Sequence, residues 1–533
     1  MENNVVTEIK EQEVVTKPVF SLDSGDKLFA VFSLIFSIFT SVFGIFGGFS
    51  LGYSISSVLM FILFFAYFIK NRKFSFSIFV FGLLSLLNSS IFLMTTNSSV
   101  RFFAFVISFL LSLVCYSFIV DYNIKGNKNT LSIFYCAIST MENVSISIRS
   151  IFSKENGDKK NFVKALVGFI FAVPVLLIIV PILIASDDAF SGMMKGIFEN
   201  TFSTLLKAIF GVLISLIIIS YGFSLKNDKV AKPKQANFKG IDNVYLISFL
   251  SAIGLIYVMY LFSQLAYFFS AFKGFLPDGK ITYAQYARKG FFEMCVIAVI
   301  NIIIVSIAML ISKKKNGNIC IGIKFLATFF GGFTLIIIST AISKMVLYIT
   351  AYGMTVLRLT TSAFMLFLAI VFIGLILKIY LRKINIIKTA LITAGCIVFI
   401  LGALNVNSVC AQYNYYSYKA GKLETIDVNA LYELGDEGIP YVIKLTACDD
   451  EEVRSSARFY IARAYIYDYF EDMELKDDFT VEDLKKKRIN DSFSYFSIPK
   501  NKAYNELYRL IEKNPHFAKI CCEIIYPTEE IYY

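Results

Sequence analysis

The feature that most constrains this chain is a series of apolar runs, each long enough to cross a lipid bilayer. A membrane-spanning helix needs about 20 predominantly apolar residues. Eleven runs meet that length, at residues 28–46, 51–69, 74–95, 102–120, 163–185, 202–224, 244–272, 291–312, 321–347, 357–380 and 388–405. Inside a bilayer the backbone polar groups must bond within the segment, so each run is expected to be helical. The sequence therefore predicts an all-α, polytopic transmembrane bundle.

Composition agrees with that class. The 533 residues are 56% hydrophobic and 17% charged, whereas soluble domains carry about 25% charged residues. Residues 1–405 have a net charge of +18, and residues 406–533 have −7. The basic excess lies in short loops between apolar runs, where it sets orientation and does not indicate nucleic-acid binding. The expected partner is the lipid bilayer, with no nucleic acid.

The orientation follows from the basic residues in alternate loops. One set of loops and the adjoining helix ends holds 23 Lys and Arg, and the other set holds 7. Because basic residues are enriched in cytoplasmic loops, the first set is predicted to be cytoplasmic. The N-terminus is then inside, and with eleven spans everything after residue 405 is outside. The expected localisation is a bacterial cytoplasmic membrane.

Five segments follow from this topology. They are a cytoplasmic polar tail (1–27), four transmembrane helices (28–120), a cytoplasmic loop (121–162), a core membrane domain with seven helices (163–405) and an extracytoplasmic helical domain (406–533). The sequence allows two interpretations of the loop 121–162. It is either an amphipathic helix along the inner membrane surface or an ordinary loop with one short helix. The polar, acidic start lacks a basic segment ahead of a short apolar core, so we expect no cleaved signal peptide.

The inventory of chemically active side chains is small. His516 is the single histidine, and no Cys-x-x-Cys pair occurs among the nine cysteines. This excludes a Ser-His-Asp triad or a histidine-based zinc site in the membrane portion. We predict no metal site and no cofactor. Cys410, Cys448, Cys521 and Cys522 fall in the predicted outer domain, as two disulfides or as free buried thiols.

Placing the polar residues on this topology gathers a group at the predicted outer ends of the helices. Its members are Asp187, Asp188, Lys207, Gln264, Tyr283, Tyr286, Arg288, Glu293, Lys344, Tyr352 and Arg358. Charged groups at membrane depth are costly and usually face a cavity or a partner. Two interpretations are open. The side chains are snorkelling groups and structural ion pairs at helix ends, or they line an outward cleft for an anionic lipid head group or a phosphate-bearing substrate.

The densest part of this group is ITYAQYARKGFFE, residues 281–293. Thr282 and Gln285 have the spacing of a capping box, which predicts a helix start. On that helix Tyr286, Lys289, Gly290 and Glu293 share a face, and Gly290 allows a neighbouring helix to approach closely. We expect an interfacial helix that continues into the eighth span.

This stretch, with its Tyr-Ala-x-Tyr-x-Arg-x-Gly-Phe-Phe-Glu pattern, resembles a bacterial polytopic family, the domain of unknown function 4173, a sibling of 4153. AYGMTVLRL (351–359) and the exit from the last run, LNVNSVCAQYNYYSYKAG, are similar to the same family, and the similarity extends over roughly residues 160–445. The resemblance implies the fold class but no activity, cofactor or substrate.

Three function classes are therefore open. The first is a non-enzymatic envelope sensor, scaffold or assembly protein whose outer domain binds another envelope protein. The second is an envelope lipid- or glycan-modifying enzyme with an outward-facing site. The third is a transporter, which the sequence favours least because no inverted repeat and no acidic series across the bilayer midplane is evident.

Overall fold

The computed structural model describes residues 20–69, 75–119, 143–152, 179, 182–183, 186, 201–227, 240–273, 283–314, 318–381, 384–466, 497–514, 516–517 and 520. Over these residues the fold is all-helical and has no strand. Ten of the described helices are long and apolar enough to cross a membrane. The predicted fold class is confirmed. The remaining predicted span, 163–185, lies almost wholly outside the described residues.

The first bundle is built from the helices on either side of the cytoplasmic loop predicted over 121–162. It contains α1 (Ser24–Phe39) with its π-helical continuation (Thr40–Ile45), α2 (Leu51–Ile69), α3 (Phe76–Met94), α4 (Ser98–Ile119), α6 (Val144–Phe152) and α9 (Thr201–Lys226). Its core is aromatic and aliphatic, with Phe81, Leu111 and Phe223 fully buried. α6 is the described part of the 121–162 loop and packs against α9.

Small residues let α1 and α9 lie in close contact. A Cβ added at Gly211 would lie 2.6 Å from the Cα of Ile38. Ser33 and Ser37 are buried on the same helix as Ile38, and the hydroxyl of Ser41 donates to the carbonyl of Lys207. Helices in membranes associate through such small-residue contacts and interhelical hydrogen bonds.

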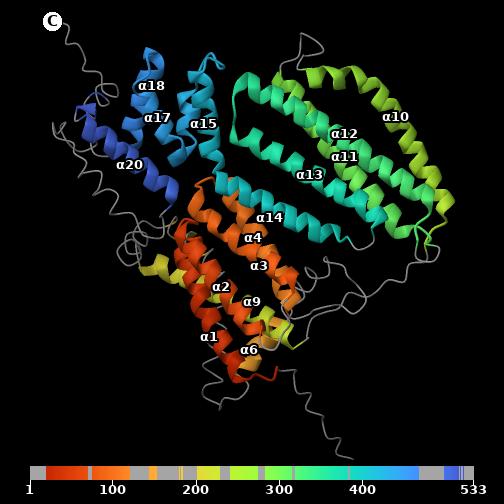
Figure 1. The fold of residues 1–533 in the computed structure, drawn as a ribbon. Helices are drawn as coiled ribbons and strands as arrows, with labels where there is room; N and C mark the ends of the chain where they lie inside the picture. Colours follow the sequence, from red (N-terminus) through yellow and green to blue (C-terminus); the bar gives the residue numbers. More distant parts are fainter. Residues whose placement is uncertain are drawn as a thin grey trace, which may run out of the picture.

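The second bundle consists of α10 (Asn243–Lys273), α11 (Tyr283–Ile311), α12 (Ile321–Tyr352) and α13 (Val356–Tyr380). α12 packs against the other three. At its centre Tyr257 donates to Asn301 at 2.9 Å, and Asn301 donates to Thr334 at 2.8 Å. α14 (Ile386–Leu404) packs on α3, α4 and α13, so it joins the two bundles (Figure 1).

The outer surfaces of these helices are apolar. Phe249 and Phe262 on α10, and Val296 and Leu310 on α11, are exposed large hydrophobic side chains. A soluble protein rarely exposes this many large apolar side chains. The protein is therefore a multi-pass membrane protein, and these side chains contact the lipid bilayer.

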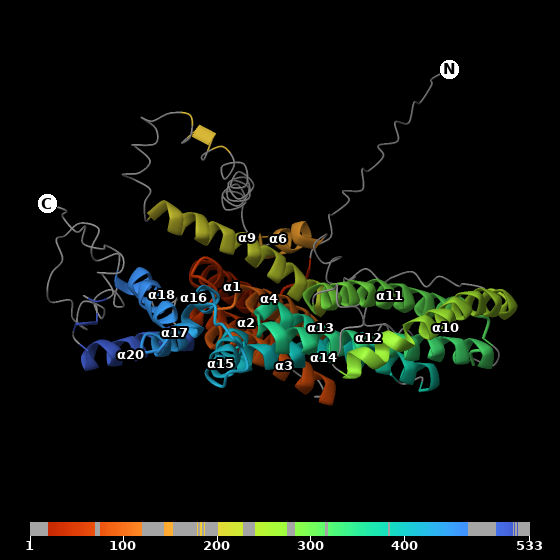
Figure 2. The same cartoon turned by 90° about the horizontal axis from the view of Figure 1, so that it is seen from above.

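A helical C-terminal domain follows α14. It contains α15 (Val406–Lys419), α16 (Val428–Tyr432), a 3-10 turn (Gly435–Glu437), α17 (Ile439–Leu445), α18 (Glu451–Ile461), a π-helical turn (Ala462–Ile466) and α20 (Ile498–Lys513). Its separate core includes Leu431, Val442, Ile461 and Leu507. Figures 1 and 2 show this domain beside the first bundle, on the side away from α10. The segment 406–533, which the sequence predicts to be helical, forms these helices, and its residues 467–496 lie outside the described residues.

Candidate functional site

Part of the predicted polar group is assembled where α11, α12 and α13 end on the side of the C-terminal domain. α11 begins at Tyr283, and Thr282, the N-cap of the predicted capping box, lies outside the described residues. α11 buries Ala287, Gly290 and Met294 on one face. Lys344 of α12 lies over Gly290, since a Cβ at Gly290 would be 2.9 Å from its Cδ and 3.3 Å from its Nζ. A larger residue at position 290 would displace this side chain, so Gly290 forms a notch on α11 that holds the Lys344 side chain in its present position.

Lys344 is 9% exposed, yet two charged side chains of α11 act on its ammonium group. Glu293 attracts it and Lys289 repels it. Both α11 residues are exposed. The predicted shared face of α11 thus contains a lysine notch flanked by one acid and one base.

Two arginines meet at Tyr348, one turn further along α12. The guanidinium carbon of Arg358 lies 3.9 Å from the centre of the Tyr348 ring, a cation–π contact. Arg358 also donates to the carbonyl of Tyr352 at 2.9 Å and to that of Gly353. Arg288 of α11 acts electrostatically on the same tyrosine. Helices α11, α12 and α13 therefore each contribute a cation to one small region.

The remaining predicted members are distributed differently. Lys207 is half-buried on α9, in the first bundle, and does not belong to the α11–α13 group. Tyr352 is exposed at the end of α12. Asp187 and Asp188, and the side chains of Gln264, Tyr283 and Tyr286, lie outside the described residues. The structure thus brings together five members of the predicted group: Arg288, Glu293, Lys344, Tyr352 and Arg358.

Sequence reasoning missed a second polar constellation, between the C-terminal domain and the turn that joins α3 to α4. Glu437 is 4% exposed, and its carboxylate accepts from the backbone N–H of Thr96 at 2.6 Å. The hydroxyls of Thr95 and Thr96 also donate to it. Arg101 of α4 acts electrostatically on Glu437 and donates to the Thr95 carbonyl at 2.7 Å. A buried carboxylate is stable only with such partners.

Two asparagines at the α14–α15 junction complete this contact. Asn405 adopts the left-handed conformation, with φ of 56°, and its side-chain amide donates to the Met94 carbonyl at 2.8 Å. Asn407 donates to the Leu434 carbonyl and accepts from Asn97, both at 2.8 Å. A short polar residue tolerates this backbone region best after glycine. The signal in the sequence is the Asn-Val-Asn motif at the exit from the last apolar run, which gives no indication of its partners in the α3–α4 turn.

A third contact fixes the turn between α12 and α13. The side chain of Asn414, on α15, donates to the Met354 carbonyl at 2.8 Å and accepts from the Met354 N–H at 2.7 Å. Gly353, with φ of 76°, precedes Met354, and a Cβ there would lie 2.7 Å from Asn414 Oδ1. The C-terminal domain is therefore hydrogen-bonded to the ends of both bundles.

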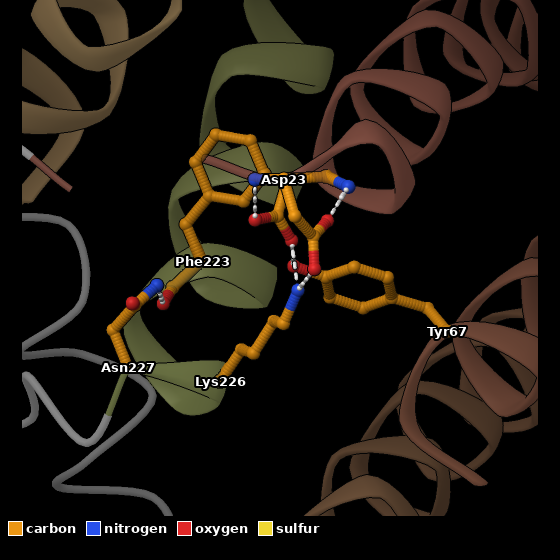
Figure 3. A network of polar contacts seen from close by, with 6 residues as sticks. Asp23, Tyr67, Phe223, Lys226 and Asn227 are labelled. Atoms are coloured by element: carbon orange, nitrogen blue, oxygen red, sulfur yellow. Dashed lines mark hydrogen bonds and ion pairs between the residues drawn. The ribbon is translucent and has the colours of Figure 1, made fainter. Parts of the chain in front are cut away.

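The opposite end of the first bundle holds a separate ion-pair network (Figure 3). Asp23 and Asp26 form a capping box at the start of α1. Lys226 of α9 forms ion pairs with both, at 2.9 Å to Asp23. The hydroxyl of Tyr67, on α2, donates to Asp26 at 2.7 Å. Asp26 is 1% exposed, so this network joins three helix ends around one buried carboxylate.

Among the described residues, no group of three His, Cys, Asp or Glu side chains could hold a metal ion. Cys410 and Cys448 are free thiols, whereas Cys521 and Cys522 lie outside the described residues. Burial raises the pKa of the Cys410 thiol to about 12, so it is not a ready nucleophile.

Comparison with known proteins identifies one family. No curated protein and no solved structure matches the chain. A family model described as "Domain of unknown function (DUF4153)" matches residues 55–445. The expectation of family 4173 is therefore wrong. The match also begins far ahead of residue 160, so it includes α3, α4 and most of α2 as well as the second bundle. Since the model covers well over half of the chain, this protein is a member of the DUF4153 family.

Proposed function

We propose that this protein is a non-enzymatic scaffold or assembly protein of a bacterial cytoplasmic membrane. In this proposal the N-terminus is cytoplasmic and the C-terminal helical domain is extracytoplasmic. The domain presents a surface to another envelope protein, and the membrane helices hold that surface at a fixed position.

The observation that carries the proposal is the attachment of the C-terminal domain through Glu437. A domain tethered by a flexible linker has few contacts with its neighbours. Here a buried carboxylate, Asn407 and Asn414 hydrogen-bond to the α3–α4 and α12–α13 turns. Such contacts keep the domain in one orientation, which favours a positioning role.

The orientation is supported by the arrangement of charges. Asp23, Tyr67 and Lys226 meet at one end of the first bundle, and Lys388 of α14 donates to Ser77 of α3 at 2.6 Å. These residues belong to segments that the basic-residue count assigns to the cytoplasm. Lys422→Cys and Lys314→Cys, in a cysteine-free background, test this assignment. An impermeant thiol reagent should label position 422 in intact cells and position 314 only after lysis, and the reverse pattern contradicts the orientation.

The functional proposal is tested by complementation of a strain that lacks the protein. Deletion of 420–533 should abolish complementation, whereas Glu293→Gln, Asp187→Asn and Asp188→Asn should retain it at normal protein level. A photo-crosslinking residue at Ile498, which is exposed on α20, should trap one defined envelope protein. The same residue at Phe292, exposed on α11, is the control and should not trap that protein.

The opposite result would favour an enzyme. Loss of complementation with a single carboxylate substitution, at normal protein level and with an intact C-terminal domain, would contradict the scaffold proposal. Substrate flux in reconstituted vesicles would favour a transporter.

A further inference from the structure

We propose that α11, α12 and α13 form a binding site for the phosphodiester head group of an anionic membrane lipid, with Lys344, Arg358 and Arg288 as its cationic contacts. The site is distinct from the surface of the C-terminal domain on which the proposed scaffold role depends. Four observations carry the inference.

The first observation is the position and burial of the Lys344 side chain. Its side chain crosses Gly290 and is 9% exposed, so most of its stem is covered by α11. Long cationic side chains near a membrane interface usually snorkel into the aqueous layer. This one is instead held against a neighbouring helix at the depth of the notch, which fixes its ammonium group in place.

The second observation is the pair of arginines at Tyr348. Arg358 stacks on the ring at 3.9 Å and is anchored by the carbonyls of Tyr352 and Gly353. Arg288 acts on the same tyrosine from α11. Guanidinium groups bind phosphate oxygens through two parallel hydrogen bonds. Two of them next to one tyrosine hydroxyl make a suitable phosphate-binding arrangement.

The third observation is the local charge. Arg288, Lys289, Lys344 and Arg358 are four cations, and the structure places one carboxylate, Glu293, among them over the described residues. Like charges so close together repel, and near a low-dielectric bilayer that repulsion is weakly screened. A bound anion would relieve it.

The fourth observation identifies the anion as lipid-borne. Phe292 of α11 is 65% exposed and Leu357 of α13 is 72% exposed. Each is adjacent in sequence to a charged residue of the site, Glu293 and Arg358 respectively. Apolar surface beside a cationic group matches a ligand with a charged head and apolar tails. A soluble phosphate would gain nothing from these side chains.

Native mass spectrometry of the purified full-length protein tests the inference. Phosphatidylglycerol and phosphatidylcholine are titrated separately, and inorganic phosphate is titrated in a third arm. The wild-type protein should bind one phosphatidylglycerol in preference to phosphatidylcholine. Lys344→Gln and Arg358→Gln should each weaken that binding by about tenfold, the change expected for one lost charge-assisted contact.

Two further variants separate binding from folding. Glu293→Gln removes the carboxylate and should tighten phosphatidylglycerol binding, a gain that misfolding cannot produce. Lys313→Gln removes an exposed cation beyond the other end of α11 and should leave binding unchanged.

Three results would overturn the inference. One is equal binding of phosphatidylglycerol by the wild type and by Lys344→Gln and Arg358→Gln. Another is binding that Glu293→Gln leaves unchanged or weakens, which would make Glu293 and Lys344 a structural ion pair only. The third is binding of inorganic phosphate with the same variant pattern and no preference for phosphatidylglycerol, which would assign the site to a soluble anion. None of these results depends on the C-terminal domain, so a failure of the lipid-binding inference would not contradict the scaffold proposal.

Discussion

The carboxylate of Glu437 accepts a hydrogen bond from the backbone N–H of Thr96 at 2.6 Å, across 341 residues of sequence. One residue lies in the C-terminal domain and the other in the turn between two membrane helices. Among the described residues, this is the hydrogen bond that joins a carboxylate of the C-terminal domain to a backbone N–H of the α3–α4 turn. The contact buries a carboxylate, which requires its donors to stay in place.

Glu437→Ala should therefore loosen the C-terminal domain from the first bundle. Each buried donor left without an acceptor costs about 1–3 kcal/mol. The expected result is a lower temperature of unfolding in detergent and faster proteolysis after residue 405. Glu433→Ala is the matched control, because Glu433 is exposed and, within the part of the chain that the structure describes, its side chain accepts from Asn429 at the surface. Equal effects of the two substitutions would contradict a special role for Glu437.

Cys410 gives an independent measure of the same junction. It packs with Ile91 and Phe92 of α3, and burial raises its pKa to about 12. Because the thiolate is the reactive form, a hydrophilic maleimide at pH 8 should label Cys410 very slowly in the wild type. Labelling should accelerate in Glu437→Ala and stay slow in Glu433→Ala. Rapid labelling of the wild type would show that the junction is open in solution.

The sequence predicted the membrane helices well and the junction poorly, for a physical reason. Apolar runs are local signals, so ten of the spans could be located to within a few residues. Glu437 sits in a polar segment, Glu433 to Gly438, that has no pattern distinguishing a buried acid from an exposed one. Its partners are 341 residues away, and only the folded chain brings them together.

The predicted polar group shows the same limit. Helical spacing placed Gly290 and Glu293 on one face of α11, and the structure puts Lys344 against that face. Depth in the membrane alone grouped Lys207 with them, although it lies on α9 in the other bundle. The predicted topology gives the depth of a residue in the membrane. It does not give which helices lie next to each other in the bundle.

Gly353→Ala should destabilise the α12–α13 turn. Gly353 has a φ of 76° and a ψ of −179°, a backbone region that is essentially confined to glycine and costs other residues about 1–3 kcal/mol. A Cβ there would also lie 2.7 Å from Asn414 Oδ1. Asn414→Ala removes that obstruction together with two hydrogen bonds to Met354. The double variant should therefore be more stable than the sum of the two single losses predicts. Strict additivity in thermal unfolding would show that Gly353 and Asn414 do not interact.

Gly211→Ala should weaken the α1–α9 contact. The new methyl group would lie 2.6 Å from a backbone atom, the Cα of Ile38, which cannot rotate away. Overpacking of this kind costs about 1–3 kcal/mol. Gly332→Ala, in α12, is the control because its Cβ would meet nothing within 4 Å. Unfolding in increasing SDS should shift for the first variant and not for the second, and a shift of similar size in both would rule out a steric cause.

Asp26 and Asp23 differ in burial, and their substitutions should differ accordingly. Asp26 is 1% exposed and hydrogen-bonded to Lys226 and Tyr67. Asp26→Asn removes one of the two carboxylates that pair with Lys226 and weakens buried hydrogen bonds, so it should cost about 1–3 kcal/mol. The Asp23 side chain is 63% exposed, and solvent screening limits Asp23→Asn to at most about 1 kcal/mol.

The hydrogen bond from Lys226 and the backbone N–H of Asp26 hold the pKa of Asp23 below its ordinary value. A lowered pKa in the folded state stabilises the protein above the unfolded value of about 3.9, and that contribution is lost as the pH falls through the folded value. Between pH 6 and pH 3 the wild type should therefore lose slightly more stability than Asp23→Asn. A steeper loss in Asp23→Asn would mean that the Asp23 carboxylate does not stabilise the start of α1.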